Sequence, residues 1–156
     1  MELNKAKKIA GEFIQEISDL VSSVEVVGSV RREQPYPRDL DFVLIPENPL
    51  TFKVDFINRF KKSIKQIGNK LIRLSYKDQQ IDCYVANKST WETLKLIRTG
   101  STNHNRKLCM KAINMNLKLK ADGTGLIDKN GNIIANTEHS IIETLLGKYI
   151  EPYERD

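Results

Sequence analysis

Three aspartates and a glycine-serine pair are the residues of this sequence whose types and spacing could carry out chemistry. Gly28 and Ser29 follow an apolar run over 24–27, and Asp39 and Asp41 come ten and twelve residues after the serine. On an extended chain the side chains at positions i and i+2 share a face, so these two carboxylates point the same way. A phosphate-binding turn beside two carboxylates that can hold a metal ion is typical of nucleotidyl transfer.

The third carboxylate, Asp82, lies in the alternating segment 80–85, on the face opposite Ile81 and Cys83. Hard oxygen ligands suit Mg²⁺, which keeps several waters and completes its shell with substrate phosphates. Three acidic residues on adjacent strands can hold two such ions, or Mn²⁺ in their place, and two metals clamp the attacking and leaving oxygens of an in-line displacement. The three aspartates are therefore the candidate metal ligands and catalytic residues.

The hydrophobic pattern predicts the elements that must position these groups. Apolar residues recur at helical spacing in two segments, strand-like runs lie between them, and Pro35 and Pro37 stop a short helix that begins at Ser29. The expected elements of the first half are helices over 4–21 and 52–67, strands over 25–27 and 40–46, and a hairpin of strands over 70–76 and 79–86. This hairpin turns around Lys77-Asp78.

The second half of the chain is predicted to contain helices and a small hairpin. We expect helices over 90–97 and 101–115, short strands over 117–120, 126–127 and 133–134, and a final helix that begins at Thr137, a residue type that caps helices. The turn signal Lys129-Asn130-Gly131-Asn132 favours a hairpin. A calcium loop starting at Asp128 is the alternative, but Ile133 and His139 replace the glycine and glutamate that such a loop requires.

Length and composition limit the class of protein. At 156 residues and 17.9 kDa the chain is one domain's worth of sequence, or one catalytic unit of two subdomains. It contains no apolar stretch as long as a membrane span and no apolar N-terminal signal segment, so we expect a soluble intracellular protein. Cys83 and Cys109 form neither a disulfide framework nor a zinc site with nearby histidines.

Positive charge is concentrated in one segment. The chain has a net charge of +5, and between Asn87 and Lys120 only Glu92 is acidic. The basic residues of this segment that we expect to contact DNA phosphates are Lys88, Lys95, Arg98, Arg106, Lys107 and Lys111. Each neutralised phosphate would release condensed counterions, whereas the alternative is an ordinary solvated helix face.

These residues resemble a known family. The palm of family X DNA polymerases, the group that contains DNA polymerase beta, is similar to three blocks of this chain: Gly28-Ser29-Val30-Arg31-Arg32, Asp39-Leu40-Asp41 and Ile81-Asp82. The C-terminal blocks of the family resemble Thr99-Gly100-Ser101, His104-Asn105 and Lys148-Tyr149-Ile150-Glu151-Pro152. The likeness covers residues 24–156 and implies a minimal palm-plus-thumb form without a lyase domain, as in certain viral members.

The resemblance implies a fold and a set of roles. The fold is an α/β (α+β) nucleotidyltransferase palm with a mixed sheet over 1–87, followed by a small helical and β-hairpin subdomain over 88–156. Asp39 and Asp41 match the ligands that bridge both metals, and Asp82 matches the ligand that faces the primer 3′-hydroxyl. Nucleotide binding is implied for Gly28, Ser29, Arg32, Thr99, Gly100 and Asn105.

The activity implied by the resemblance is template-directed DNA synthesis. A monomer would add a nucleotide from a dNTP to a primer 3′-hydroxyl, release pyrophosphate, and fill short gaps in DNA during repair. One alternative is a template-independent nucleotidyltransferase that acts on a nucleic-acid end, a small molecule or a protein, and another is a nucleic-acid-binding module without activity. The chain departs from the family at Ile97-Arg98, where an aromatic pair is common, and at Cys109, where an arginine commonly checks the templating base.

Overall fold

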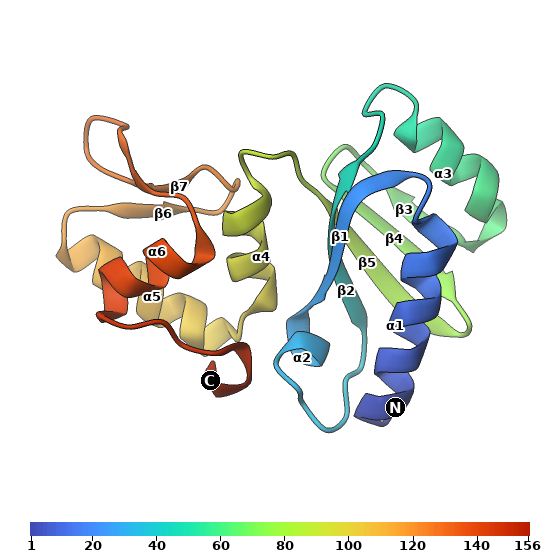
Figure 1. Cartoon of the computed structure of the whole chain (residues 1–156), viewed down its shortest axis with the longest axis horizontal. Coiled ribbons are helices and arrows are strands. Elements are labelled where there is room, and N and C mark those ends of the chain that lie inside the picture. The colour runs from blue at the N-terminus through green and yellow to red at the C-terminus, as the bar shows by residue number, and fades with distance from the viewer.

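The computed structural model describes all of residues 1–156 and has two lobes, joined by the segment between β5 and α4 (Figure 1). The elements of the N-terminal lobe are α1 (Leu3–Ile17), β1 (Val21–Val27), α2 (Gly28–Arg31), β2 (Leu40–Pro46), α3 (Phe52–Phe60), η1 (Lys61–Ser63), β3 (Ile64–Ile67), β4 (Leu71–Tyr76) and β5 (Gln79–Val85). Those of the C-terminal lobe are α4 (Trp91–Thr99), α5 (Thr102–Asn114), β6 (Lys118–Lys120), β7 (Gly125–Ile127), β8 (Ile133–Ala135), α6 (Glu138–Leu146) and η2 (Pro152–Glu154).

The N-terminal lobe is built on a five-stranded mixed sheet with the strand order β1-β2-β5-β4-β3. β2 and β5 run parallel, and the other neighbouring strands run antiparallel. The structure thus confirms the predicted mixed α/β class. The predicted hairpin is also present, since β4 and β5 pair antiparallel on either side of Lys77-Asp78. These two turn residues have positive φ angles of 49° and 64°, as a tight two-residue turn requires.

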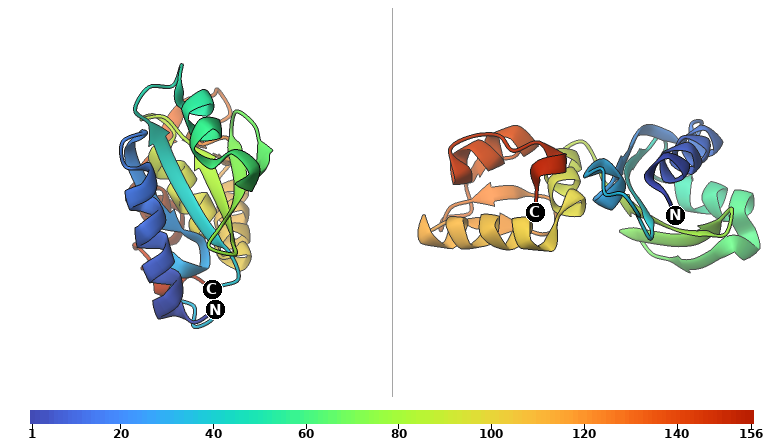
Figure 2. Two further views of the ribbon diagram at one scale, coloured as in Figure 1. Left: turned by 90° about the vertical axis from the view of Figure 1, so that its right-hand side faces the viewer. Right: turned by 90° about the horizontal axis from the view of Figure 1, so that it is seen from below.

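Helices α1 and α3 cover one face of this sheet (Figure 2). Their buried aromatic side chains, such as Phe13 and Phe56, pack on the strand residues that point toward them, such as Phe42. Because successive side chains of a strand face opposite ways, this packing turns Asp41 and Asp82 to the other face. That face is open toward the C-terminal lobe.

Two helices are shorter than the sequence predicts. α3 ends at Phe60 instead of continuing to residue 67, and Ile64–Ile67 forms the edge strand β3, paired with β4. Lys61, with a φ of 40°, ends the helix, and the two isoleucines of so short a run fit either a helical or a strand pattern. α1 likewise ends at Ile17, because Val21 already pairs with β2.

The C-terminal lobe has its own core. Leu96 of α4, Leu108 of α5 and Leu126 of β7 pack together with the buried side of α6, and β6, β7 and β8 form a three-stranded sheet. The predicted cap Thr137 accepts a hydrogen bond from the backbone N–H of Ser140 at the start of α6. None of the helices is both long and apolar enough to cross a lipid bilayer.

Candidate active site

The candidate catalytic side chains share one cross-strand row of the sheet. Asp41 of β2 lies opposite Asp82 of the parallel strand β5, and Arg73 of β4 pairs with Asp82 on its other side. Asp39 precedes β2 by one residue and lies two residues before Asp41. The sheet therefore gathers carboxylates from two segments that are far apart in the sequence.

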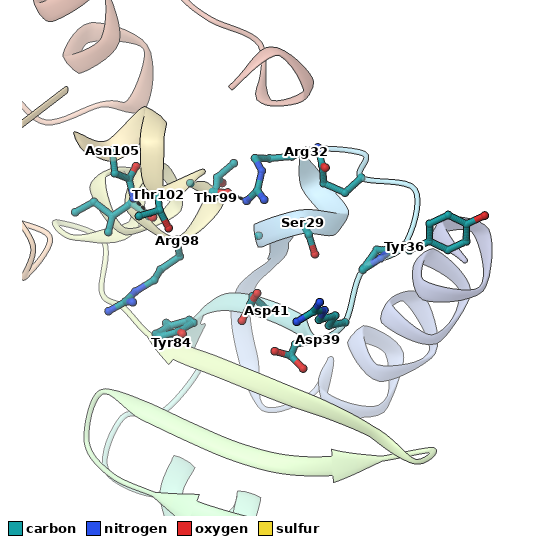
Figure 3. Close-up of a pocket in the computed structure, with 16 residues that line it drawn as sticks. Ser29, Arg32, Tyr36, Asp39, Asp41, Tyr84, Arg98, Thr99, Thr102 and Asn105 are labelled. Carbon is teal, nitrogen blue, oxygen red and sulfur yellow. Dashed lines mark hydrogen bonds between the residues drawn. The ribbon is translucent and has the colours of Figure 1, made fainter. Parts of the chain in front are cut away.

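The turn that leads into α2 passes very close to Asp41. Gly28 has a φ of 61°, and a Cβ atom placed on it would lie 2.4 Å from Oδ2 of Asp41. Any side chain at residue 28 would displace this carboxylate, so both the backbone conformation and the available space require glycine. Figure 3 shows Ser29 and Asp41 facing the same space as a result.

A cavity of about 540 Å³ opens between the two lobes at this row (Figure 3). It contains all six residues for which nucleotide binding is expected, together with two of the three aspartates. Its lining residues are Gly28, Ser29, Arg32, Gln34, Tyr36, Pro37, Arg38, Asp39, Asp41, Tyr84, Ile97, Arg98, Thr99, Gly100, Thr102 and Asn105. Because α2 and the loop after it form one wall and the turn between α4 and α5 forms another, the site depends on both lobes.

Asp82 is outside this cavity lining because it is already paired. Arg73 donates to both of its carboxylate oxygens, from Nε to Oδ1 at 2.7 Å and from Nη2 to Oδ2 at 3.1 Å. In this conformation no three histidine, cysteine, aspartate or glutamate side chains converge closely enough to hold a metal ion. The predicted set of three ligands therefore requires these side chains to move closer together, although the Asp82 oxygens keep lone pairs for a metal beside the Arg73 hydrogen bonds.

The donor set itself fits Mg²⁺. Burial, and then the negative charges of Asp82 and Asp39, raise the pKa of Asp41 to about 6. Carboxylates that repel one another in this way gain most from a divalent cation, and their oxygens are the ligands that Mg²⁺ prefers. Asp39 and Asp41 would hold the ion from the cavity side, and Asp82 would join them after a movement of its side chain.

Metal binding should weaken as the pH falls through about 6. Mg²⁺ requires the ionised form of Asp41, so below this pKa each bound ion must displace a proton. We expect the half-saturating Mg²⁺ concentration, measured by calorimetric titration between pH 5 and 8, to rise by up to about tenfold per pH unit on the acid side. Asp41→Asn should bind the ion weakly at every pH, and a flat profile for the wild-type protein would contradict the raised pKa.

Two arginines of α2 connect the lobes. Arg32 donates from Nη1 to the backbone carbonyl of Thr99 at 2.5 Å. Arg31 makes a two-pronged ion pair with Glu138, with N–O distances of 2.6 and 2.7 Å, and Arg155 donates to the same carboxylate at 2.8 Å. The opposite walls of the cavity are therefore held together by contacts made directly behind the Gly28-Ser29 turn.

Comparison with known proteins agrees with this geometry. Residues 95–156 match the family described as DNA polymerase beta thumb. Among solved structures, a ternary primer-template complex of polymerase beta from Leishmania infantum aligns with 100% of this chain and 76% of its own, with a TM-score of 0.84 and 16% identity. The chain has a family X polymerase-like fold. A search of curated proteins found no match to the sequence.

In this fold the N-terminal lobe is the palm, and two residues of the thumb have partners that the sequence did not predict. The Arg98 guanidinium lies over the ring of Tyr84 at 4.1 Å from the centroid, instead of on a free helix face. The Asn105 amide nitrogen donates to the carbonyl of Ile97 at 2.9 Å, and its Oδ1 atom is buried without a partner. Asn105 lines the cavity as expected, and this hydrogen bond uses only one of the two N–H donors of its amide.

His104 packs inside the thumb and does not line the cavity. Its side chain is buried behind the cavity, and neither ring nitrogen has a hydrogen-bond partner. Burial, and then the charge of Arg155, lower its pKa to about 4, so the imidazole is neutral at physiological pH. The position is one of packing inside the thumb.

The basic residues of the thumb divide into two groups. Lys95 is only 12% exposed, and its Nζ atom lies 3.0 Å from Glu92 and 3.7 Å from Glu25, so its charge is already balanced inside the protein. We expected Lys95 to be exposed and to contact a DNA phosphate, whereas the structure shows it mostly buried and paired with carboxylates. Of the residues expected to contact DNA, the exposed ones are Lys88, Arg98, Arg106, Lys107 and Lys111.

Sequence reasoning missed three residues that shape the site. Arg73 could have been found, because a two-residue hairpin at Lys77-Asp78 fixes the register that places it opposite Asp82. Glu138 gave no such signal, because its partners are distant in the sequence. Arg38 was overlooked because an arginine next to an aspartate after a proline is typical of any charged surface loop.

Proposed function

We propose that this chain is a template-directed DNA polymerase that adds a nucleotide from a dNTP to a primer 3′-hydroxyl, releases pyrophosphate, and fills short gaps in DNA repair. The observation that carries the proposal is the shared cavity, in which Gly28-Ser29 and two aspartates of the palm face Thr99-Gly100 of the thumb. A phosphate turn, a metal site and a turn that packs against the sugar are the parts that phosphoryl transfer to a primer needs. The polymerase beta fold supports DNA as the substrate.

The residues of the chain would mainly position substrate and neutralise charge. The Ser29 hydroxyl and the Arg32 guanidinium would bind the triphosphate, and Thr99-Gly100 would pack against the incoming sugar. Asp82 would face the primer 3′-hydroxyl and accept its proton. The metal ions, held by the three aspartates, would supply charge neutralisation and activate the hydroxyl.

Primer extension on a duplex with a one-nucleotide gap tests this function. With each dNTP offered separately, we expect efficient addition only of the nucleotide that pairs with the template base. Equal addition of all four nucleotides would favour the template-independent transferase. If no nucleotide were added with either Mg²⁺ or Mn²⁺, the polymerase function and transfer to a DNA end would both be wrong, and only a transferase that acts on a small molecule or a protein would remain.

DNA binding should depend strongly on salt concentration. α5 exposes Arg106 and Lys107 side by side, and each phosphate contact that they make would release counterions. We expect the double variant Arg106→Ala with Lys107→Ala to flatten the slope of log binding constant against log salt by roughly one to two units. Fluorescence anisotropy with labelled gapped DNA measures this slope, and an unchanged slope would mean that these side chains are merely solvated.

Fidelity should be low because of Cys109. This residue is exposed and follows Asn105 by one helical turn on the same side of α5, but a thiol is too short and too weak a donor to test a template base. We expect Cys109→Arg to raise the ratio of correct to incorrect insertion by about fivefold or more, or about 1 kcal/mol. Steady-state insertion of each mismatch measures the ratio, with Cys109→Ser as the size-matched control. No change in the arginine variant would place residue 109 away from the template.

A further inference from the structure

We propose that Arg38 is a second arginine of the triphosphate site and binds the phosphates that leave as pyrophosphate. This inference rests on the proposed function, because it names a further ligand for the same substrate. Arg38 belongs to the loop between α2 and β2 and lines the cavity next to Asp39. The sequence motifs and the resemblance to family X predicted no role for Arg38.

Arg38 is the free cation of the cavity. Three arginines line it, and two of them have partners: Arg32 donates to the carbonyl of Thr99, and Arg98, which makes no hydrogen bond, is positioned by stacking of its guanidinium on Tyr84. The third, Arg38, makes no hydrogen bond or ion pair with any residue of the chain, although the carboxylates of the metal site are close by. A guanidinium that is left unpaired beside a phosphate-binding turn is available for a bidentate contact with a ligand phosphate.

The loop that carries Arg38 is fastened to the phosphate-binding turn. The backbone N–H of Gln34 donates to the carbonyl of Ser29 at 3.0 Å, and the N–H of Leu3 donates to the carbonyl of Pro35 at the same distance. Pro37, directly before Arg38, is buried, and its ring fixes one backbone dihedral. The backbone at residue 38 is therefore held in place, while the exposed side chain is free to turn into the cavity.

The charge of the cavity favours a second arginine for the leaving group. Asp39 and Asp41 repel a triphosphate until metal ions neutralise them. Arg32 already donates one N–H group to the carbonyl of Thr99 in the thumb, so fewer of its donors are available for the phosphates. During transfer, negative charge collects on the departing β- and γ-phosphates, which lie away from the bond that forms to the primer. A planar cation beside Asp39 would oppose this charge, so its removal should weaken the binding of dNTP but not of dNMP.

Equilibrium binding of a nucleotide series tests the inference without turnover. The protein, with Mg²⁺, is bound to a one-nucleotide-gapped duplex whose primer ends in a dideoxynucleotide, and the complementary dNTP, dNDP and dNMP are titrated in turn. Arg38→Ala should weaken dNTP binding by about tenfold and leave dNMP binding within about twofold. Arg38→Lys, which keeps the charge but loses the planar fork, should lie between Arg38→Ala and the wild type. Arg59→Ala removes the same charge on α3, away from the cavity, and should bind dNTP like the wild type.

Each other outcome has a definite meaning. If the wild-type protein prefers dNTP to dNMP and Arg38→Ala keeps that preference, Arg38 does not bind the triphosphate, while the proposed function stands. If Arg38→Ala instead weakens binding of the gapped duplex without nucleotide by the same factor, the ligand is a DNA phosphate and the inference is wrong. If the wild-type protein binds dNTP no better than dNMP, the triphosphate site itself is absent, and the proposed function fails together with the inference.

Discussion

Replacing Asp39, Asp41 or Asp82 by alanine should lower the rate of primer extension by about a thousandfold or more. In the proposed reaction the three carboxylates would act as one unit, because each metal ion would need more than one of them to neutralise charge on the phosphates. Single-turnover extension on gapped DNA measures the rate. DNA affinity without metal should change little, because the predicted phosphate contacts are on the thumb.

The matched control for this series is Asp55→Ala, which removes a carboxylate from α3 on the other face of the sheet. It should extend primers at the wild-type rate. Asp82 provides the most informative comparison, because it is the only one of these three aspartates that is already paired with an arginine. Extension by Asp82→Ala within about tenfold of the wild type would remove it from the ligand set, and leave a metal site of two aspartates.

The second large effect is expected on stability, at Glu138. Its carboxylate is 6% exposed and accepts hydrogen bonds from Arg31, which is 18% exposed, and from Arg155, which is fully buried. Glu138→Ala would leave two guanidinium groups inside the protein without a counter-ion, and breaking a buried pair in this way typically costs about 3–5 kcal/mol. We expect this loss in the free energy of unfolding measured by urea denaturation.

The variant Glu138→Gln separates the charge from the shape of this side chain. The control for loss of a negative charge on α6 is Glu143→Ala, because Glu143 is exposed. Burial alone would raise the pKa of Glu138, but the hydrogen bonds and charges of Arg31 and Arg155 outweigh it and hold the pKa below its ordinary value. The stabilisation by Glu138 is therefore complete above the ordinary pKa of a glutamate and is lost as the pH falls through the lower pKa of the folded protein.

The difference in stability between the wild type and Glu138→Gln should accordingly be largest near neutral pH and shrink under acid conditions. A difference that is small at neutral pH would mean that the ion pairs contribute little. Because Arg31 is next to Arg32, loss of Glu138 should also loosen the contact from Arg32 to the carbonyl of Thr99. Primer extension by Glu138→Ala at a temperature where it remains folded would show this second effect as a weaker affinity for dNTP.

Local rules were sufficient for much of this protein. A mostly apolar run predicted β2, and the alternation of apolar residues predicted β5. Period two predicted that Asp39 and Asp41 share one side of the chain, because neighbouring side chains of a strand face opposite ways. The cap at Thr137 depends only on residues within one helical turn, and the structure confirms it. The pairing of Arg73 with Asp82 could also have been predicted from the hairpin at Lys77-Asp78, since a two-residue turn fixes the register of both strands.

Short apolar runs were the limit of this reasoning. The sequence over 64–67 fits a helix or a strand, and only the exposed edge of β4, which offers hydrogen-bond partners, makes it strand β3. Lys95 and Arg98 show the same limit for charge. Both were expected to contact DNA, but Lys95 lies beside Glu92 of its own helix and Glu25 of β1, and Arg98 stacks on Tyr84 of β5. Only the folding of α4 against the sheet brings Glu25 and Tyr84 to them.

The tertiary structure alone decided how the two lobes form one site. Arg31 and Glu138 are 107 residues apart, and Arg32 and Thr99 are 67 apart, so no periodicity or local spacing relates them. Side chains at such distances meet only after each lobe has buried its own core and the lobes pack together. The sequence by itself therefore determined which residues could carry out the chemistry, while the packing of palm and thumb determined which of them face one cavity and which, such as Arg38, remain free to bind a substrate.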